Sequence, residues 1–335
     1  MMLLNPAIMA LLLVSIVVCS MLMLASGFAI QILRHWDIES GSERQLGLER
    51  RTYLISTLLI WAFSFELMSL LLFIYNAESM SGQFVGAMCA TGVLNVNGWG
   101  WPTLFLKIAV FFSGAVWLAL NYLDNQGYDY PVVKHKYRLL LAILPLVVAE
   151  FILQLLYFTN MDPDVITSCC GTLFSSQAKG VAAEVSGLPP KNMMLVFILI
   201  GVIVIASSLR VVLRGRGNCL FALLGGAAFV VALMSIVSFV SLYIYEHPHH
   251  HCPFCILKSG HDYVGYILYV PLFIAAALAM SVGALSSWRD KPSLTLTVNR
   301  VIPRLSWIAV IFFALFYLAA GWSIWASNLT MAEVW

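Results

Sequence analysis

Residues 219–245 read CLFALLGGAAFVVALMSIVSFVSLYIY and contain no charged side chain. A helix of about 20 apolar residues is long enough to cross the hydrocarbon core of a bilayer. Because backbone polar groups cannot stay unpaired in hydrocarbon, this stretch is expected to form a transmembrane helix. Arg214 and Arg216 precede it, and the segment HPHHHCPFC at 247–255 follows it. One end of the span is therefore basic, and the other carries thiols and imidazoles.

Seven further apolar stretches of similar length occur, so about eight spans are expected. The eight stretches lie near residues 8–33, 53–75, 103–123, 137–158, 192–213, 219–245, 263–285 and 305–326. The chain is 61% hydrophobic and only 10% charged, whereas soluble domains carry about 25% charged residues. The sequence predicts an all-α, polytopic membrane helix bundle over 1–335, a single integral membrane domain. Its first span is expected to be an uncleaved anchor, because Met1–Pro6 has no positive charge.

The basic residues predict the orientation of the spans. Alternate loops or their edges hold 14 of the 18 Lys and Arg residues, while the opposite loops hold only Lys107, Lys179, Lys191 and Lys258. Loops rich in Lys and Arg stay cytoplasmic. The protein is therefore expected in the inner membrane of a cell, with both termini on the extracytoplasmic side.

Several function classes find no support in the sequence. The net charge is +2 and no basic patch is present, so a nucleic-acid partner is not expected. The chain also lacks a phosphate-binding glycine loop, a nucleophile elbow and a dinucleotide fingerprint. ATP-driven transport and hydrolysis are therefore not expected.

Five of the seven cysteines fall in the three loops that are expected to face the periplasm or cell exterior. They are Cys89, Cys169, Cys170, Cys252 and Cys255. Disulfides form and persist in such a compartment. An odd number of thiols means that at least one is free, bound to a metal or bonded to a partner.

Cys252-Pro253-Phe254-Cys255 is the most informative of these segments. Pro is favoured at a helix start, so Cys252 is expected near the positive end of a helix dipole, where a thiol becomes a better nucleophile. Such a pair suits either a dithiol–disulfide couple or a soft metal ion. Candidate additional metal ligands are His247, His249, His250, His251 and His261.

The segment Cys170-x-x-Leu173-Phe174-Ser175-Ser176 resembles the loop of the vitamin K epoxide reductase family, in which a shuttle cysteine precedes a similar sequence. Two predicted helices later comes Cys252-x-x-Cys255, in the order that this family shows. The resemblance implies a four-helix redox core over 137–285. It also implies an active Cys252–Cys255 pair beside a quinone, and relay cysteines at 169–170 that pass electrons to a soluble thiol protein.

The resemblance extends more faintly to the loop that begins Cys89-x-x-x-Val93-Leu94. The family's two loop cysteines are spaced apart, whereas Cys169 and Cys170 are adjacent. The polar segment 259–262 also interrupts the helix that in the family runs on from the second cysteine.

Two acidic residues lie inside predicted spans, Glu66 in the second and Glu150 in the fourth. A charge there costs a few kcal/mol or more, so such residues face the bundle interior and are often functional. Each could transfer protons to or from a quinone or the thiol site. Alternatively, each could serve helix packing, with Lys107 or Gln154 as a partner for Glu150.

Three functions remain open from the sequence. The first is an enzyme, a thiol–disulfide oxidoreductase that exchanges electrons between outer thiols and a membrane carrier such as quinone. The second is a soft-metal site, copper above all, for uptake or delivery to an extracytoplasmic metalloenzyme. The third is a non-catalytic subunit of a larger respiratory or transport complex with structural disulfides.

Overall fold

The computed structural model describes residues 4–162, 164–167 and 181–329 of the chain. Eight of its helices are long and apolar enough to cross a membrane, and no strand occurs among the described residues. The predicted all-α membrane bundle and its eight spans are confirmed. The eight long helices are α1 (Pro6–His35), α2 (Glu43–Ser79), α4 (Gly100–Asp124), α5 (Val133–Thr159), α8 (Pro190–Arg214), α9 (Asn218–Ser235, continued by η3 and α10), α11 (Val264–Ser286) and α12 (Thr295–Ala326).

Shorter elements join these helices at their ends. They are η2 (Ser81–Gln83), α3 (Ala90–Leu94), α7 (Val181–Ser186), the π-helical turn η3 (Ile236–Val240), α10 (Ser241–Tyr245), η4 (Cys255–Leu257) and η5 (Ser259–His261). The apolar run that predicts one continuous span at 219–245 is therefore a chain of α9, η3 and α10. Hydropathy detects the apolar length of such a span, but it does not detect a change in the helix type.

The chain divides into two compact units, which we describe separately. Unit 1 comprises residues 1–76, 97–161 and 287–299, and unit 2 comprises 77–96, 162–286 and 300–335. The resemblance implies a four-helix core over 137–285. This range does not coincide with either unit, because α5 belongs to unit 1 whereas α8, α9 and α11 belong to unit 2.

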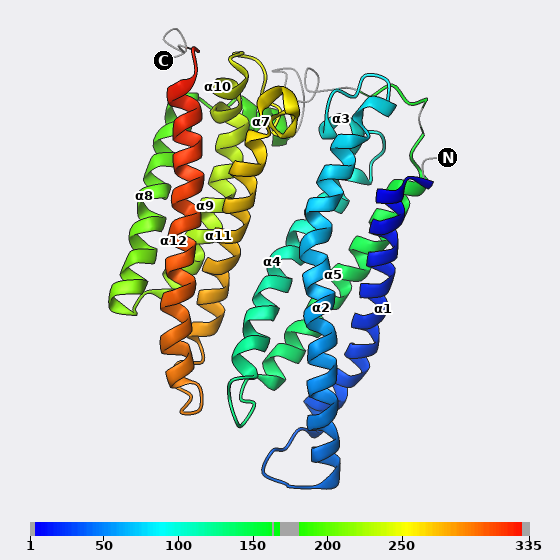
Figure 1. The fold of residues 1–335 in the computed structure, drawn as a ribbon, viewed down its shortest axis with the longest axis vertical. Coiled ribbons are helices and arrows are strands. Elements are labelled where there is room, and N and C mark those ends of the chain that lie inside the picture. The colour runs from blue at the N-terminus through cyan, green and yellow to red at the C-terminus, as the bar shows by residue number, and fades with distance from the viewer. Residues whose placement is uncertain (1–3, 163, 168–180, 330–335) are drawn as a thin grey trace. The chain divides into compact units, whose positions relative to one another are not determined.

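In unit 1, α5 packs against α1 and α4 (Figure 1). The ring of Phe63 on α2 lies 4.9 Å from that of Trp117 on α4. A Cβ atom at Gly114 would lie 3.0 Å from Phe63, so this glycine makes room for the ring. The Trp117 indole N–H donates to the backbone carbonyl of Lys136 at 3.0 Å, which satisfies its donor inside the apolar core.

In unit 2, α9 packs against α8 and α11 (Figure 1). The α9–α11 contact is made by small residues. A Cβ atom at Gly225 would lie 2.4 Å from that of Ala279, and one at Gly283 would lie 2.5 Å from that of Ala222. Helices in membranes approach closely through such residues. The contact lies near the start of α9 and the end of α11, and it holds together the two helices that precede and follow the segment 246–263.

Two lysines lie deeper than their sequence positions suggest. Lys107 was expected in an outer loop, and Lys136 was counted among the basic loop residues. Both lie within helices and are almost fully buried. Each has an acidic partner, since Lys136 Nζ is 2.6 Å from Asp124 Oδ2 and Lys107 Nζ is 2.6 Å from Glu150 Oε1. The remaining basic residues still favour the same loops.

Candidate functional site

Three cysteines of unit 2 form a buried cluster. The sulfur atoms of Cys89, Cys252 and Cys255 all lie within 4.8 Å of one another, and each residue is buried. Cys89 Sγ and Cys252 Sγ are 3.4 Å apart, although 163 positions separate them in the chain. A disulfide bond is about 2.05 Å long, so this pair is in contact and not bonded. The three sulfurs are close enough to exchange bonds or to hold a metal ion.

The position of Cys89 is fixed by the short helix that it precedes, α3. The backbone N–H of Ala90, in the first turn of α3, donates to Glu78 Oε2 at 2.8 Å. Glu78 Oε1 lies 3.4 Å from Lys258 Nζ, three residues after Cys255. One carboxylate therefore links the Cys89 segment to the Cys252–Cys255 segment. Since Lys258 is partly exposed, the ion pair itself contributes little, roughly 0–1 kcal/mol.

Two tyrosines hold the backbone of the Cys-x-x-Cys segment. The Tyr245 hydroxyl, at the end of α10, donates to the Cys252 carbonyl at 2.5 Å. The Tyr269 hydroxyl, on α11, donates to the Pro253 carbonyl at 2.7 Å. The Thr91 hydroxyl lies 3.3 Å from Cys252 Sγ, within hydrogen-bonding distance of the thiol. Consecutive carbonyls of the segment are thus tied to two different helices.

The prediction that a helix starts at Cys252 is wrong. Neither Cys252 nor Pro253 starts an α-helix. The segment is irregular until η4 begins at Cys255, and α11 begins only at Val264. Asp262 and Tyr263 have positive φ angles of 52° and 55°, which break the helical path before α11. The expected helix dipole is absent at Cys252, so it cannot activate this thiol.

Two glycines on either side of Cys89 in the sequence, Gly86 and Gly92, have close neighbours that leave no room for a side chain. Gly86 has a φ of 85°, and a Cβ atom there would lie 2.3 Å from the carbonyl oxygen of Thr167. The Thr167 N–H donates to the Val85 carbonyl at 2.9 Å. A Cβ atom at Gly92 would lie 2.7 Å from Ala87. Thr167 is therefore held beside the Cys89 segment, and Cys169 and Cys170 lie outside the described residues.

The five candidate histidines do not join the sulfur cluster in the described part of the chain. His251 Nδ1 lies 2.9 Å from the carbonyl of Val237, in the π-helical turn. His250 and His261 pack on the ring of Tyr245, with centroid distances of 4.1 and 4.7 Å. His247 lies next to His249 on the exposed part of the loop. These histidines contact Tyr245, the π-helical turn and one another. Among the described residues, the cluster therefore consists of the three cysteine sulfurs alone.

Burial changes the titration of two of these histidines. It lowers the pKa of His251, and the neighbouring His249 and His250 lower it further, while the hydrogen bond to Val237 acts in the opposite direction. Burial also lowers the pKa of His261. Both rings therefore favour the neutral form in the folded protein.

The two acidic candidates lie in unit 1, whereas the cysteine cluster belongs to unit 2. Glu150 is buried against Lys107, as one of the two sequence interpretations suggested. Gln154, the other expected partner of Glu150, instead donates to Ser15 Oγ at 2.9 Å and to the Leu11 carbonyl at 3.3 Å. Of the other two cysteines, Cys19 is buried in α1 and Cys219 is exposed on α9.

Sequence reasoning missed four side chains of the site, which are Glu78, Thr91, Tyr245 and Tyr269. Tyr245 and Tyr269 lie in apolar spans, where tyrosines at membrane interfaces are common. Thr91 and Glu78 carry no motif. Only the presence of a carboxylate close to Cys89 in the sequence could have drawn attention to Glu78.

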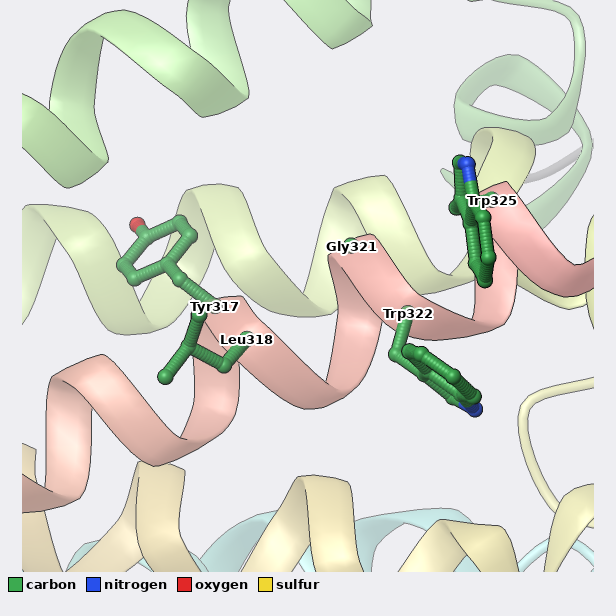
Figure 2. Close-up of a pocket in the computed structure, with 5 residues that line it drawn as sticks. All are labelled: Tyr317, Leu318, Gly321, Trp322 and Trp325. Atoms are coloured by element: carbon green, nitrogen blue, oxygen red, sulfur yellow. The ribbon is translucent and has the colours of Figure 1, made fainter.

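Unit 2 also has an open hollow that shares no residue with the cysteine cluster. Its lining comes entirely from one face of α12, as Figure 2 shows. Tyr317, Leu318, Gly321, Trp322 and Trp325 line it, and both tryptophans are strongly exposed. Exposed tryptophans near a helix end are typical of the interface between lipid and water. None of the three clustered cysteines lines this hollow.

Comparison of the chain with protein-family models, with curated proteins and with solved structures found no match. The arrangement of the three sulfur atoms is therefore the main evidence for a function.

Proposed function

We propose that this protein is a membrane thiol–disulfide oxidoreductase with Cys252 and Cys255 as its redox pair and Cys89 as the thiol that exchanges with them. The observation that carries the proposal is the 3.4 Å separation of Cys89 Sγ and Cys252 Sγ. Reacting atoms in a near-attack arrangement lie about 3–3.5 Å apart. A third thiol at that distance from a Cys-x-x-Cys pair is what disulfide exchange requires.

The exchange step follows from this arrangement. In the oxidised protein Cys252 and Cys255 form a disulfide. The Cys89 thiolate attacks the Cys252 sulfur, a Cys89–Cys252 bond forms, the Cys252–Cys255 bond breaks, and Cys255 leaves as a thiolate that takes up a proton. When the Cys89–Cys252 bond is later broken, Cys252 leaves as a thiolate, to which the Thr91 hydroxyl can donate a hydrogen bond.

The complete cycle needs a donor and an acceptor. The donor is an extracytoplasmic dithiol protein, which loses two electrons and two protons as its disulfide forms. The acceptor is a membrane carrier of the quinone class, which takes up two electrons and two protons from Cys252 and Cys255. Cys169 and Cys170 would receive the donor's electrons, and a thiolate of this pair would attack the Cys89 sulfur. The Cys89–Cys252 bond then breaks, and Cys252 and Cys255 are both thiols before they reduce the acceptor. This role is supported by the position of Thr167, whose N–H donates to the Val85 carbonyl.

A second function is favoured by the compactness of the cluster. A metal–thiolate bond of about 2.3 Å places two sulfurs on one ion about 3.8–4 Å apart. The three sulfurs lie within 4.8 Å of one another, so a small movement would let them hold a soft ion such as Cu(I). The shorter Cys89–Cys252 contact makes exchange the better-supported function.

Trapping the mixed disulfide tests the proposal on the full chain in lipid nanodiscs. Cys255→Ser removes the leaving thiol, so mild oxidation should accumulate a Cys89–Cys252 disulfide that peptide mass spectrometry identifies. Cys252→Ser should abolish any such bond to Cys89. Cys219→Ser, which changes an exposed cysteine of the same unit, serves as the control and should leave the disulfide pattern unchanged.

Metal analysis of the same variants separates the two functions. Copper that remains with the wild-type protein and is lost equally in the Cys89, Cys252 and Cys255 variants would favour the metal site. The oxidoreductase proposal fails if no reversible disulfide involving Cys252 forms in the native protein.

A further inference from the structure

Each helix of the four-helix core of unit 1 places a polar or titratable side chain in the same buried region. They are Cys19 on α1, Glu66 on α2, Lys107 on α4 and Glu150 on α5. All four are nearly inaccessible, with exposed fractions of 4%, 3%, 2% and 0%. This region is independent of the cysteine cluster and of the function proposed for it.

Lys107 and Glu150 form the fixed part of this group. Lys107 Nζ lies 2.6 Å from Glu150 Oε1 and donates to Ser69 Oγ at 2.6 Å. The ammonium group therefore has a carboxylate and a hydroxyl as direct partners. Such a pair is tolerated in an apolar interior because the opposite charges compensate each other.

Glu66 is the unbalanced member. It interacts electrostatically with both Glu150 and Lys107, and Cys19 interacts with both carboxylates. Glu66 Oε1 is buried and has no hydrogen-bond partner among the described residues. With one ammonium and two carboxylates, the group would carry a net negative charge if both acids were ionised. An uncompensated charge inside the membrane costs several kcal/mol.

A second buried pair in unit 1 shows the balanced case. Lys136 Nζ lies 2.6 Å from Asp124 Oδ2 and also donates to Asn121 Oδ1 and Ser56 Oγ. One ammonium there matches one carboxylate within the helices. The excess acid at Glu66 therefore sets its group apart from the other buried ion pair of the same unit.

We propose that Glu66 is a proton-binding site within unit 1. Its carboxylate takes up one proton and becomes a carboxylic acid, while Glu150 stays ionised against Lys107. A proton fits better than a metal cation, because the Lys107 ammonium repels a second cation. A metal would also require several convergent oxygens, and no group of three acidic, Cys or His ligands occurs here among the described residues.

Infrared spectroscopy of the full-length protein in nanodiscs tests this charge balance. The wild type should show the C=O stretching band of a protonated carboxylic acid, which shifts in D₂O and on ¹³C labelling of glutamate. Glu66→Gln should remove the band. Glu150→Gln should remove it too, because Glu66 then becomes the ionised partner of Lys107. In Lys107→Met both carboxyl groups lose their counter-charge, and the band should roughly double in area.

Asp124→Asn is the matched control, since it changes the acid of the balanced pair and should leave the glutamic acid band unchanged. Circular dichroism and size-exclusion chromatography identify variants that have not folded. A wild-type spectrum without this band, or a band that persists in Glu66→Gln, would overturn the proposal. A band that disappears when sodium ions are added would also overturn it, in favour of a cation site.

Discussion

The chemistry of the candidate site depends on how single side chains hold the backbone around Cys252. Tyr245 acts in two ways, because its hydroxyl donates to the Cys252 carbonyl and its ring packs against His250 and His261. In Tyr245→Phe the ring contacts remain and the carbonyl loses its donor. The loss of one intramolecular hydrogen bond costs about 0.5–1.5 kcal/mol.

Tyr245→Phe is therefore expected to lower the thermal stability of the protein and to speed alkylation of Cys252 under native conditions. Peptide mass spectrometry after timed alkylation measures the second effect. Tyr263→Phe, at an exposed tyrosine of the same unit, should change neither quantity. Equal alkylation rates in the wild type and Tyr245→Phe would show that this hydrogen bond does not restrain Cys252.

His251 makes stability depend on pH. Because its pKa in the folded protein is lowered from 6.5 by burial, the unfolded chain binds a proton at a pH where the folded ring stays neutral. The stabilisation is present above about pH 6.5 and is lost as the pH falls toward the lowered pKa. Acidification should therefore destabilise unit 2.

His251→Asn keeps a side-chain N–H for the Val237 carbonyl and removes the titration. It should flatten the fall in melting temperature below about pH 6.5. His35→Asn is a close control, because His35 also lies near a helix carbonyl, at 3.2 Å from Gln31, but is exposed. An unchanged pH profile in His251→Asn would assign the acid sensitivity to other groups, of which His261 is the first candidate.

At the scale of elements, the α9–α11 contact holds together the two helices that precede and follow the cysteine-bearing segment. Gly225 faces Ala279 so closely that an added Cβ would lie 2.4 Å away, whereas at the adjacent Gly226 it would meet only the flexible end of Met280 at 3.4 Å. Gly225→Ala must push the helices apart, at about 1–3 kcal/mol. Gly226→Ala should be neutral or slightly stabilising, because Ala is the better helix former.

Thermal unfolding of the two single variants in the same detergent compares neighbouring positions on one helix. A loss of stability restricted to Gly225→Ala, accompanied by faster alkylation of Cys252, is expected. Equal stability of the two variants would mean that the α9–α11 contact adjusts without cost.

The elements also show what sequence could and could not predict. All eight spans followed from hydropathy, because apolar length is the property that a bilayer selects. The first ten residues of α2, which precede the expected position 53 and include seven polar side chains, did not follow from hydropathy, because a helix can continue beyond the bilayer. The π-helical turn η3 and the irregular Cys252 segment depend on contacts with distant residues, such as Val237 with His251. A local pattern such as Cys-Pro-x-Cys does not contain that information.

The approach of Cys89 to Cys252 depends on the fold in the same way. The sequence grouped these cysteines by the side of the membrane that their loops were expected to face. It did not indicate which of the loop thiols would come into contact. The Glu78–Lys258 pair and the Thr91–Cys252 contact, which connect the two segments, involve residues without a motif.

At the scale of the whole molecule, the side of the membrane on which the cluster lies decides between the proposed functions. An even number of spans predicts that both termini lie on one side of the membrane, and the basic loops predict that side to be outside the cytoplasm. The C-terminal segment reports on the cluster directly. The backbone N–H of Asn328 donates to Glu246 at 2.8 Å, which places the end of α12 beside the start of the cysteine-bearing loop within unit 2.

An epitope added after the C-terminus should therefore be accessible to antibody in intact spheroplasts. One inserted at Gly41, in the exposed loop between α1 and α2 that Arg34 and Arg44 flank, should become accessible only after the membrane is permeabilised. The opposite result would place the three thiols in the cytoplasm, where glutathione and thioredoxin keep cysteines reduced. A stable Cys252–Cys255 disulfide would then have no oxidising compartment, and metal binding by the same three sulfurs would become the better-supported function.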